Sequence, residues 1–158
     1  AMGTNTTASG DISTAMGSGT TASGRASTAM GSRTIASGDF STAMGENTTA
    51  SDYGSVVIGQ YNSAGSSVST GGSATEFDTD NTAFVIGKGI GTAAGSRSDA
   101  FKVFFNGNTT AAGIVTANGF VGNGSGLTGI SSAATATNLA GGSVGQLPYQ
   151  SAAGTTAF

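Results

Sequence analysis

Small and apolar side chains recur at a fixed interval along the first part of the chain. The phrases STAMG and TTASG alternate, and each returns at a constant spacing. One ladder of apolar side chains contains Met2, Met16, Met30, Met44 and Ile58. A second ladder, half a repeat away, contains Ala8, Ala22, Ala36, Ala50 and Ala64. The step from Met16 to Met30 indicates a solenoid, because it is too short for helical-hairpin repeats.

Each phrase has the length of a short β-strand, and the glycines and polar residues between phrases suit tight turns. We predict that one coil holds two strands and two turns, and that successive coils stack in register at about 4.8 Å. The methionines then pair with methionines and the alanines with alanines. The glycines predicted to form turns are Gly17, Gly31, Gly45 and Gly59.

Both faces of the predicted STAMG strand carry small or apolar side chains. Thr14 and Met16 point to one face and Ala15 to the other, because side chains alternate along a strand. Parallel sheets are usually buried on both faces. The opposite strand of the coil covers one face, so we predict that neighbouring copies of the chain cover the other.

The phrases STAMG, SVVIG and TTASG at this spacing resemble the head repeats of YadA-like trimeric adhesins over residues 1–65. The resemblance implies an all-β fold, a left-handed parallel β-roll, with three rolls packed into an elongated homotrimer. In the family, Val is commoner at the positions of Thr14, Thr28 and Thr42, and Val56 restores that pattern.

The sequence pattern changes after the repeats, and we predict three regions. Residues 1–75 form the β-roll, residues 76–130 a β-rich neck with hairpins, and residues 131–158 an extended low-complexity linker. AFKVFF followed by NGN predicts a strand that enters a tight hairpin, and Asn118 with Gly119 offers a second turn. We expect the chain to continue into missing regions at both ends.

The later part resembles phage proteins. FVGNGSGLTGI and NLAGGSVGQLPYQSAAGTTAF are similar to segments of tail fibre proteins of tailed bacteriophages, and we identify residues 81–158 as fibre-like. This resemblance implies a virion fibre that takes part in host attachment, with a host cell-surface receptor, glycan or protein, as partner.

Composition excludes several classes of function. The chain has no Cys and no His, so it lacks thiolate and imidazole ligands and the usual general base. Five basic and eight acidic residues leave a net charge of −3, so the chain lacks the positive charge that binding to nucleic acid requires. We find no run of apolar residues long enough to span a membrane. We predict a protein that is not an enzyme, with no catalytic or metal residues and no cofactor.

Acidic side chains suggest one alternative site. Glu76, Asp78, Asp80 and Asn81 supply oxygen atoms suited to a hard cation such as Ca²⁺. The segment lacks the glycine and the distant glutamate of a calcium loop, so we favour a solvated loop.

Two other columns of side chains follow the repeat. Asp11, Arg25 and Asp39 place alternating charges one coil apart, and we interpret them as setting register. Pairs of hydroxyl side chains in the TTASG phrase and its equivalents resemble an ice-binding surface, which Ile35 interrupts. The pairs are Thr7 with Ser9, Thr21 with Ser23, and Thr49 with Ser51.

The preferred hypothesis is an extracellular structural or adhesive segment of a homotrimeric tail fibre, which acts as a spacer or as a receptor binder. The alternatives are the head of a bacterial trimeric surface adhesin and, from another class, an ice-binding β-solenoid.

Overall fold

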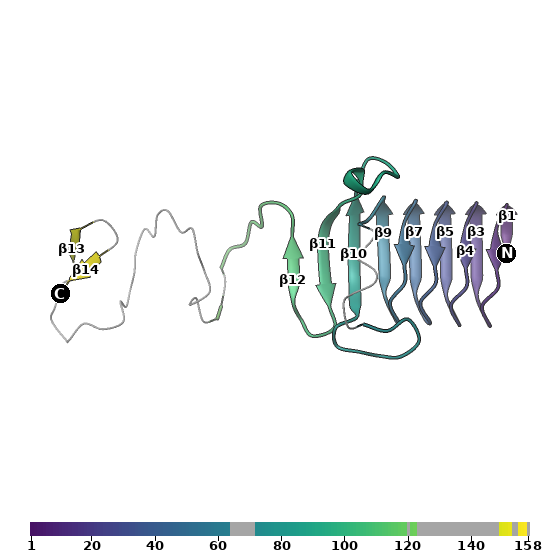
Figure 1. Cartoon of the computed structure of the whole chain (residues 1–158), viewed down its shortest axis with the longest axis horizontal. Helices are drawn as coiled ribbons and strands as arrows, with labels where there is room; N and C mark the ends of the chain where they lie inside the picture. Colours follow the sequence, from purple (N-terminus) through teal and green to yellow (C-terminus); the bar gives the residue numbers. More distant parts are fainter. Residues whose placement is uncertain (64–71, 120, 123–148, 153–154, 158) are drawn as a thin grey trace. The chain divides into compact units, whose positions relative to one another are not determined.

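The computed structural model describes residues 1–63, 72–119, 121–122, 149–152 and 155–157. The chain forms two compact units, Ala1–Thr116 and Ala117–Phe158. In the first unit, coils that each span one full repeat stack as a parallel β-solenoid (Figure 1), which confirms the predicted all-β fold. The predicted region boundaries after residues 75 and 130 remain predictions.

One long sheet, sheet A, runs through the whole first unit. Its eight strands, in spatial order, are β1 (Met2–Thr4), β3 (Thr14–Ser18), β5 (Thr28–Ser32), β7 (Thr42–Glu46), β9 (Val56–Gln60), β10 (Thr82–Lys88), β11 (Asp99–Phe104) and β12 (Thr109–Ala111). The strands are parallel from β1 to β10, whereas β11 and β12 are antiparallel to their neighbours. Sheet A therefore changes from solenoid to meander after β10.

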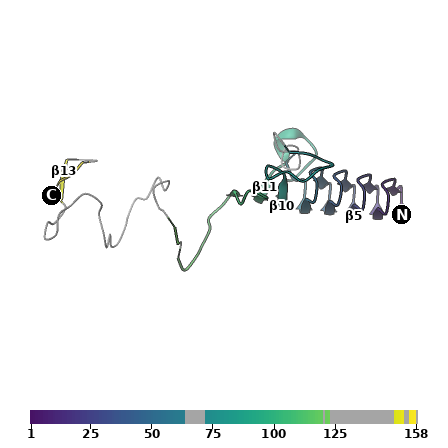
Figure 2. The ribbon, with the colours of Figure 1, turned by 90° about the horizontal axis from the view of Figure 1, so that it is seen from below.

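A second sheet, sheet B, forms the opposite side of the coils. It consists of β2 (Thr7–Ala8), β4 (Thr21–Ala22), β6 (Ile35–Ala36) and β8 (Thr49–Ala50). Figure 2 shows the coils edge on, as narrow loops in a row. Met16 pairs with Met30 in sheet A, and Ala22 pairs with Ala36 in sheet B. The in-register stacking expected from the repeat is confirmed in these strands.

The interior between the sheets is thin because its side chains are small. Ala15, Ala29 and Ala43 of sheet A are fully buried, and Val57 and Val85 continue their column. Sheet B contributes the fully buried side chains of Ala22, Ala36 and Ala50. The hydrophobic core within one chain is thus built of alanine and valine, without methionine.

Hydroxyl side chains fill the rest of the interior. The fully buried set contains Thr20, Thr34, Thr48, Ser27, Ser41 and Ser55. The Ser27 hydroxyl donates a 2.7 Å hydrogen bond to the Gly24 carbonyl oxygen. Among the described residues, the hydroxyls of Thr20, Thr34 and Thr48 have no hydrogen-bond partner. The small interior side chains allow the coils to stack closely, but some buried polar atoms are left without a hydrogen-bond partner.

The glycines predicted to form turns lie inside strands instead. Gly17, Gly31, Gly45 and Gly59 belong to β3, β5, β7 and β9 and have φ angles between 96° and 121°. A Cβ atom on Gly31 would lie 2.0 Å from the carbonyl oxygen of Gly45 in the next coil. Glycine is required here because of its φ angle and because the coils approach closely.

The turns themselves use mostly other residues. Their left-handed positions, with φ from 42° to 67°, are Asn5, Gly19, Arg33, Asn47 and Tyr61 on one edge and Ile12, Ala26, Phe40 and Gly54 on the other. Each of these turns after the first coil bonds to the preceding coil, as when Phe40 N donates to Arg25 O at 2.7 Å. We infer that these bonds between coils offset the strain of a side chain in the left-handed region.

Between β9 and β10 the chain leaves the stack. Ile58 pairs directly with Ile86, so the step between these neighbouring strands is twice the step from Met30 to Met44. Sheet B ends at β8 within the described residues. The segment 72–81 runs along the edge where the strands of sheet A begin (Figure 1).

The hairpin expected after AFKVFF is present. β11 and β12 pair, and Phe104 N donates to Asn108 O at 2.9 Å across the turn that contains Gly107. A single 3₁₀ turn, Ala94–Ser96, precedes β11. Asn118 lies at a bend, and no described strands flank it as a hairpin. The part of the chain that the structure describes contains no helix with the length and apolarity of a membrane span.

The second unit contains one described strand pair. β13 (Tyr149–Ala152) and β14 (Thr155–Ala157) are antiparallel, within the region predicted to be extended.

Replacing Gly31 with Ala tests the close approach of the coils. The new Cβ would meet backbone at 2.0 Å, so we expect a loss of at least about 3 kcal/mol in unfolding free energy, measured by denaturant titration followed by circular dichroism. Gly95→Ala is the control, because nothing lies within 4 Å of its Cβ position. Equal stabilities of the two variants would contradict this account.

Replacing Thr34 with Val tests the unsatisfied interior. Valine has nearly the same shape but removes a buried hydroxyl without a described partner, so we expect unfolding free energy to rise by about 1 kcal/mol. Ser27→Ala should lower it by about the same amount, because the Ser27 hydroxyl is hydrogen-bonded. Destabilisation by Thr34→Val would show that the Thr34 hydroxyl has a partner in solution.

Candidate self-association surface

The outer face of sheet A carries a continuous column of large apolar side chains, which we name the outer-face stripe. It consists of Met2, Met16, Met30, Met44, Ile58, Ile86 and Phe101. The methionines face outward because the alternate residues, such as Ala15 and Ala29, are the ones that fill the interior. Met16 and Met30 are half-buried, whereas Met2 is 68% exposed.

A second column lies beside the stripe and becomes more apolar along the sheet. Thr28 pairs with Thr42, Thr42 with Val56, and Val56 with Phe84. The threonines at positions where the resemblance predicts valine thus lie on this outer face and leave the core unchanged. A contiguous apolar face of this kind marks an interaction surface in a soluble protein.

A hollow lies at the β12 end of sheet A. Its volume is about 360 Å³, and its lining includes Lys88, Phe101, Ala111, Ile114 and Val115. The side chain of Ile114 is 97% exposed. Apolar surface therefore continues from the stripe to the last strand of the sheet.

The structure places the two predicted ladders in different environments. The alanine ladder faces the interior, where Ala22, Ala36 and Ala50 are fully buried and Ala8 packs against them partly buried. Ala64 lies outside the described residues. The methionine ladder and Ile58 lie on the outer face. Their role in a trimer interface remains a prediction.

The last strand of sheet B, β8, is capped by a side chain that the repeat pattern does not predict. Asn62, which is 1% exposed, accepts a 2.8 Å hydrogen bond from Thr49 N at Oδ1 and donates a 3.1 Å bond from Nδ2 to Thr49 O. Its amide thereby takes the place of the next strand beside β8. Unpaired strand edges invite pairing with other chains, and this amide blocks the edge.

Arg97 holds the capping residue in place. Its Nη1 atom donates to the carbonyl oxygens of Asn47 and Asn62, each at 3.1 Å. The guanidinium therefore joins the turn before β8 to the residue that caps β8. The doubled offset between VVIG and FVIG is the sequence signal that one coil is interrupted here.

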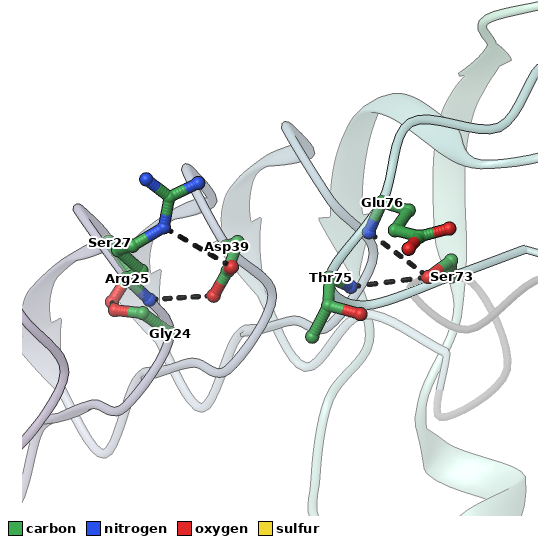
Figure 3. Close-up of polar contacts among 7 residues, drawn as sticks. All are labelled: Gly24, Arg25, Ser27, Asp39, Ser73, Thr75 and Glu76. Carbon is green, nitrogen blue, oxygen red and sulfur yellow. Dashed lines mark hydrogen bonds and ion pairs between the residues drawn. The ribbon is translucent and has the colours of Figure 1, made fainter.

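The predicted charge column forms one ion pair among the described residues. Arg25 N donates to Asp39 Oδ1 at 2.7 Å, and Arg25 Nε lies 3.6 Å from Asp39 Oδ2 (Figure 3). Asp11 joins the column through its backbone oxygen, which accepts from Ala26 N. The Arg25 side chain is 55% exposed, so the ion pair contributes little stability beyond aligning two coils.

The acidic segment forms a hydrogen-bonded loop. Asp78 Oδ1 accepts from Asp80 N at 2.8 Å, and Asn81 Nδ2 donates to Glu76 O at 3.0 Å. Ser73 Oγ accepts hydrogen bonds from Thr75 N and Glu76 N (Figure 3). Within the described residues, no three acidic side chains are grouped in a way that could hold a metal ion.

Tyr61 lies directly after β9, where the chain leaves the stack of coils. Its hydroxyl donates a 2.9 Å hydrogen bond to Glu46 Oε1, and this bond, together with desolvation and the negative charge of Glu46, raises the pKa of the Tyr61 phenol. The bond links the last coil before the interruption to the coil that precedes it.

Replacing Asn62 with Asp tests the cap. A carboxylate cannot donate to Thr49 O and is repelled by it, so the side chain should move away from β8 and release Thr49 N as well. We expect a loss of about 2 kcal/mol in unfolding free energy and faster amide exchange at Thr49. Asn118→Asp, which makes the same change at an exposed position, should leave both unchanged. Full stability and slow exchange in Asn62→Asp would show that the amide does not cap β8.

Comparison with known families agrees with the repeat geometry. The family model described as the YadA head domain repeat matches residues 1–20, 13–34 and 36–62. Neither the curated proteins nor the solved structures contain a match to this chain. The matched residues cover the coils from β1 to β9 and support a YadA-like adhesin head segment in this part of the chain.

Proposed function

We propose that the chain is a non-enzymatic segment of a homotrimeric fibre, in which the outer-face stripes of three copies pack together. The observation that carries the proposal is the apolar outer face of sheet A, whose methionines repeat in every coil from β1 to β7. The match to YadA head repeats supports a fibre of the trimeric adhesin kind.

Identical copies suit this surface better than an unrelated partner would. Each coil repeats the same outer side chains at one rung spacing, so a second copy presents a surface of the same period along its whole length. Burial of one methionine contributes about 1.5 to 3 kcal/mol, and every coil adds a further contribution. The charged side chains of Glu46 and Lys88 lie at the strand ends, beside the stripe.

The function of such a rod is mechanical and multivalent. A stack of hydrogen-bonded coils is stiff, and it holds binding surfaces away from the base of the fibre. Three copies raise avidity through effective concentration, without strong individual contacts. This mechanism requires no reactive side chain.

We place the fibre outside the cell and propose that it belongs to a bacteriophage tail and contacts a host receptor. The resemblance of residues 119–158 to segments of tail fibre proteins supports this origin. The alternative is the surface adhesin of a bacterium, with which the YadA head repeats are equally compatible.

The ice-binding alternative gains no support from sheet B. Its strands are two residues long, and Ile35 is 41% exposed between Thr21 and Thr49. A flat hydroxyl surface is therefore interrupted at the middle of a narrow sheet.

Replacing Met30 with Asp tests the proposed interface. A charge at the centre of the stripe would be buried without a partner in the trimer, so we expect assembly to be lost, as measured by light scattering after size exclusion. Ile12→Asp is the control, because Ile12 is 88% exposed at a turn. A folded Met30→Asp variant that still forms the wild-type trimer would contradict the proposal.

A further inference from the structure

We propose that one edge of the solenoid carries a binding site for neutral saccharides. The site is built on four rings, Phe40, Tyr53, Phe77 and Phe105, which we name the aromatic edge. The chain has eight Phe and three Tyr, so over a third of its aromatic side chains lie along this one edge. The inference rests on the proposed fibre only for multivalency and adds a ligand class to it.

The four rings form two contacting pairs joined at Gly54. The ring centroids of Phe40 and Tyr53 are 5.2 Å apart, and those of Phe77 and Phe105 are 5.1 Å apart, both in edge-to-face geometry. The ring of Phe105 lies over Gly54, with Cζ 3.5 Å from the position of a Cβ there. Because Gly54 directly follows Tyr53, the two ring pairs lie next to each other along the edge.

Three of the four rings are exposed in a protein that is short of large apolar side chains, and the ring of Tyr53 is half-buried. Phe40 is 42% exposed, Phe77 60% and Phe105 39%. None belongs to the core between the sheets, which is built of alanine and valine. Because large exposed apolar groups reduce solubility, their concentration on one edge indicates an interaction surface.

The backbone holds the aromatic edge in a fixed arrangement. Asp39 N donates to Ala74 O at 2.8 Å and Tyr53 N donates to Ser73 O at 2.9 Å, so the segment that leads to Phe77 is tied to the coils. Asn106 N donates to Thr79 O at 2.8 Å on the far side of Phe77. The rings are thus positioned before any ligand binds, which lowers the entropic cost of binding.

Polar side chains flank the rings. The Arg25 guanidinium lies 4.4 Å from the centroid of Phe40 and is held by Asp39. Asn106 Nδ2 donates to Asp80 Oδ1 at 3.1 Å beside Phe105. Figure 3 shows Arg25 and Asp39 on the coils, and Glu76 on the segment that carries Phe77.

Exposed rings with flanking hydrogen-bonding groups match the chemistry of a sugar. The C–H face of a pyranose packs on an aromatic ring, and its hydroxyls donate to carboxylates or accept from guanidinium and amide groups. Asp39, Glu76 and Asp80 outnumber the single cation Arg25 in this set of flanking groups. The excess of negative charge disfavours acidic sugars, so the ligand class is neutral.

Binding is measured on a panel of immobilised neutral oligosaccharides of hexoses and N-acetylhexosamines, with their sialylated and sulfated counterparts. We expect the full chain to bind at least one neutral member and to bind the acidic counterparts more weakly. Phe40→Asn and Phe77→Ser should each weaken binding at least about tenfold. Asn tolerates the left-handed φ of 58° at residue 40, so folding should be preserved.

Ile12→Asn is the matched control, because Ile12 occupies the equivalent turn position, two coils away, at a φ of 61°. It should bind like the wild type. Absence of binding to every neutral saccharide, or equal binding by wild type and both aromatic-edge variants, would overturn the inference. So would capture of basic peptides in place of saccharides. A trimer that binds no saccharide leaves the proposed fibre intact, whereas a monomer that binds through the aromatic edge overturns the fibre alone.

Discussion

The close stacking of one coil on the next is the constraint on which the rest of the structure depends. At Gly17 and Gly31 the backbone of the following coil lies so near that a Cβ would come within 2.0 Å of a carbonyl oxygen. Gly24 and Gly38, on the other side of the coil, approach the next coil almost as closely, at 2.1 Å and 2.3 Å. Asp52 takes the next position in that series, where its carboxylate accepts from Thr82 N. The small-residue composition is therefore a requirement of the geometry.

A thin interior has a consequence for the outer surface. Side chains such as Ala15 and Ala22 bury little apolar area, so one chain gains little free energy from its own core. The larger side chains lie outside, as Met30 does on the face of sheet A. Self-association through that face would provide the burial that the coil interior lacks. The proposed saccharide site, the aromatic edge, lies where β7 and β9 begin, and its rings are not part of the outer-face stripe.

The period predicted the coils and their register, because identical phrases stack best on themselves. It failed where the structure depends on contacts between coils. The local pattern predicts a turn at Gly31, whereas the requirement for glycine there comes from the backbone of the next coil, which a local pattern does not show. The cap by Asn62 and the pairing of Phe77 with Phe105 depend on a segment that leaves the stack. Only the doubled spacing between Ile58 and Ile86 gives a sign of it.

Sedimentation equilibrium of the unaltered chain tests the central claim, that the outer face of sheet A is covered by other copies, most directly. The account predicts a mass of about three times the 15.0 kDa of one chain, constant over a wide range of concentration. A folded species with the mass of a single chain would contradict it, because the outer-face stripe would then be stable in water without a partner.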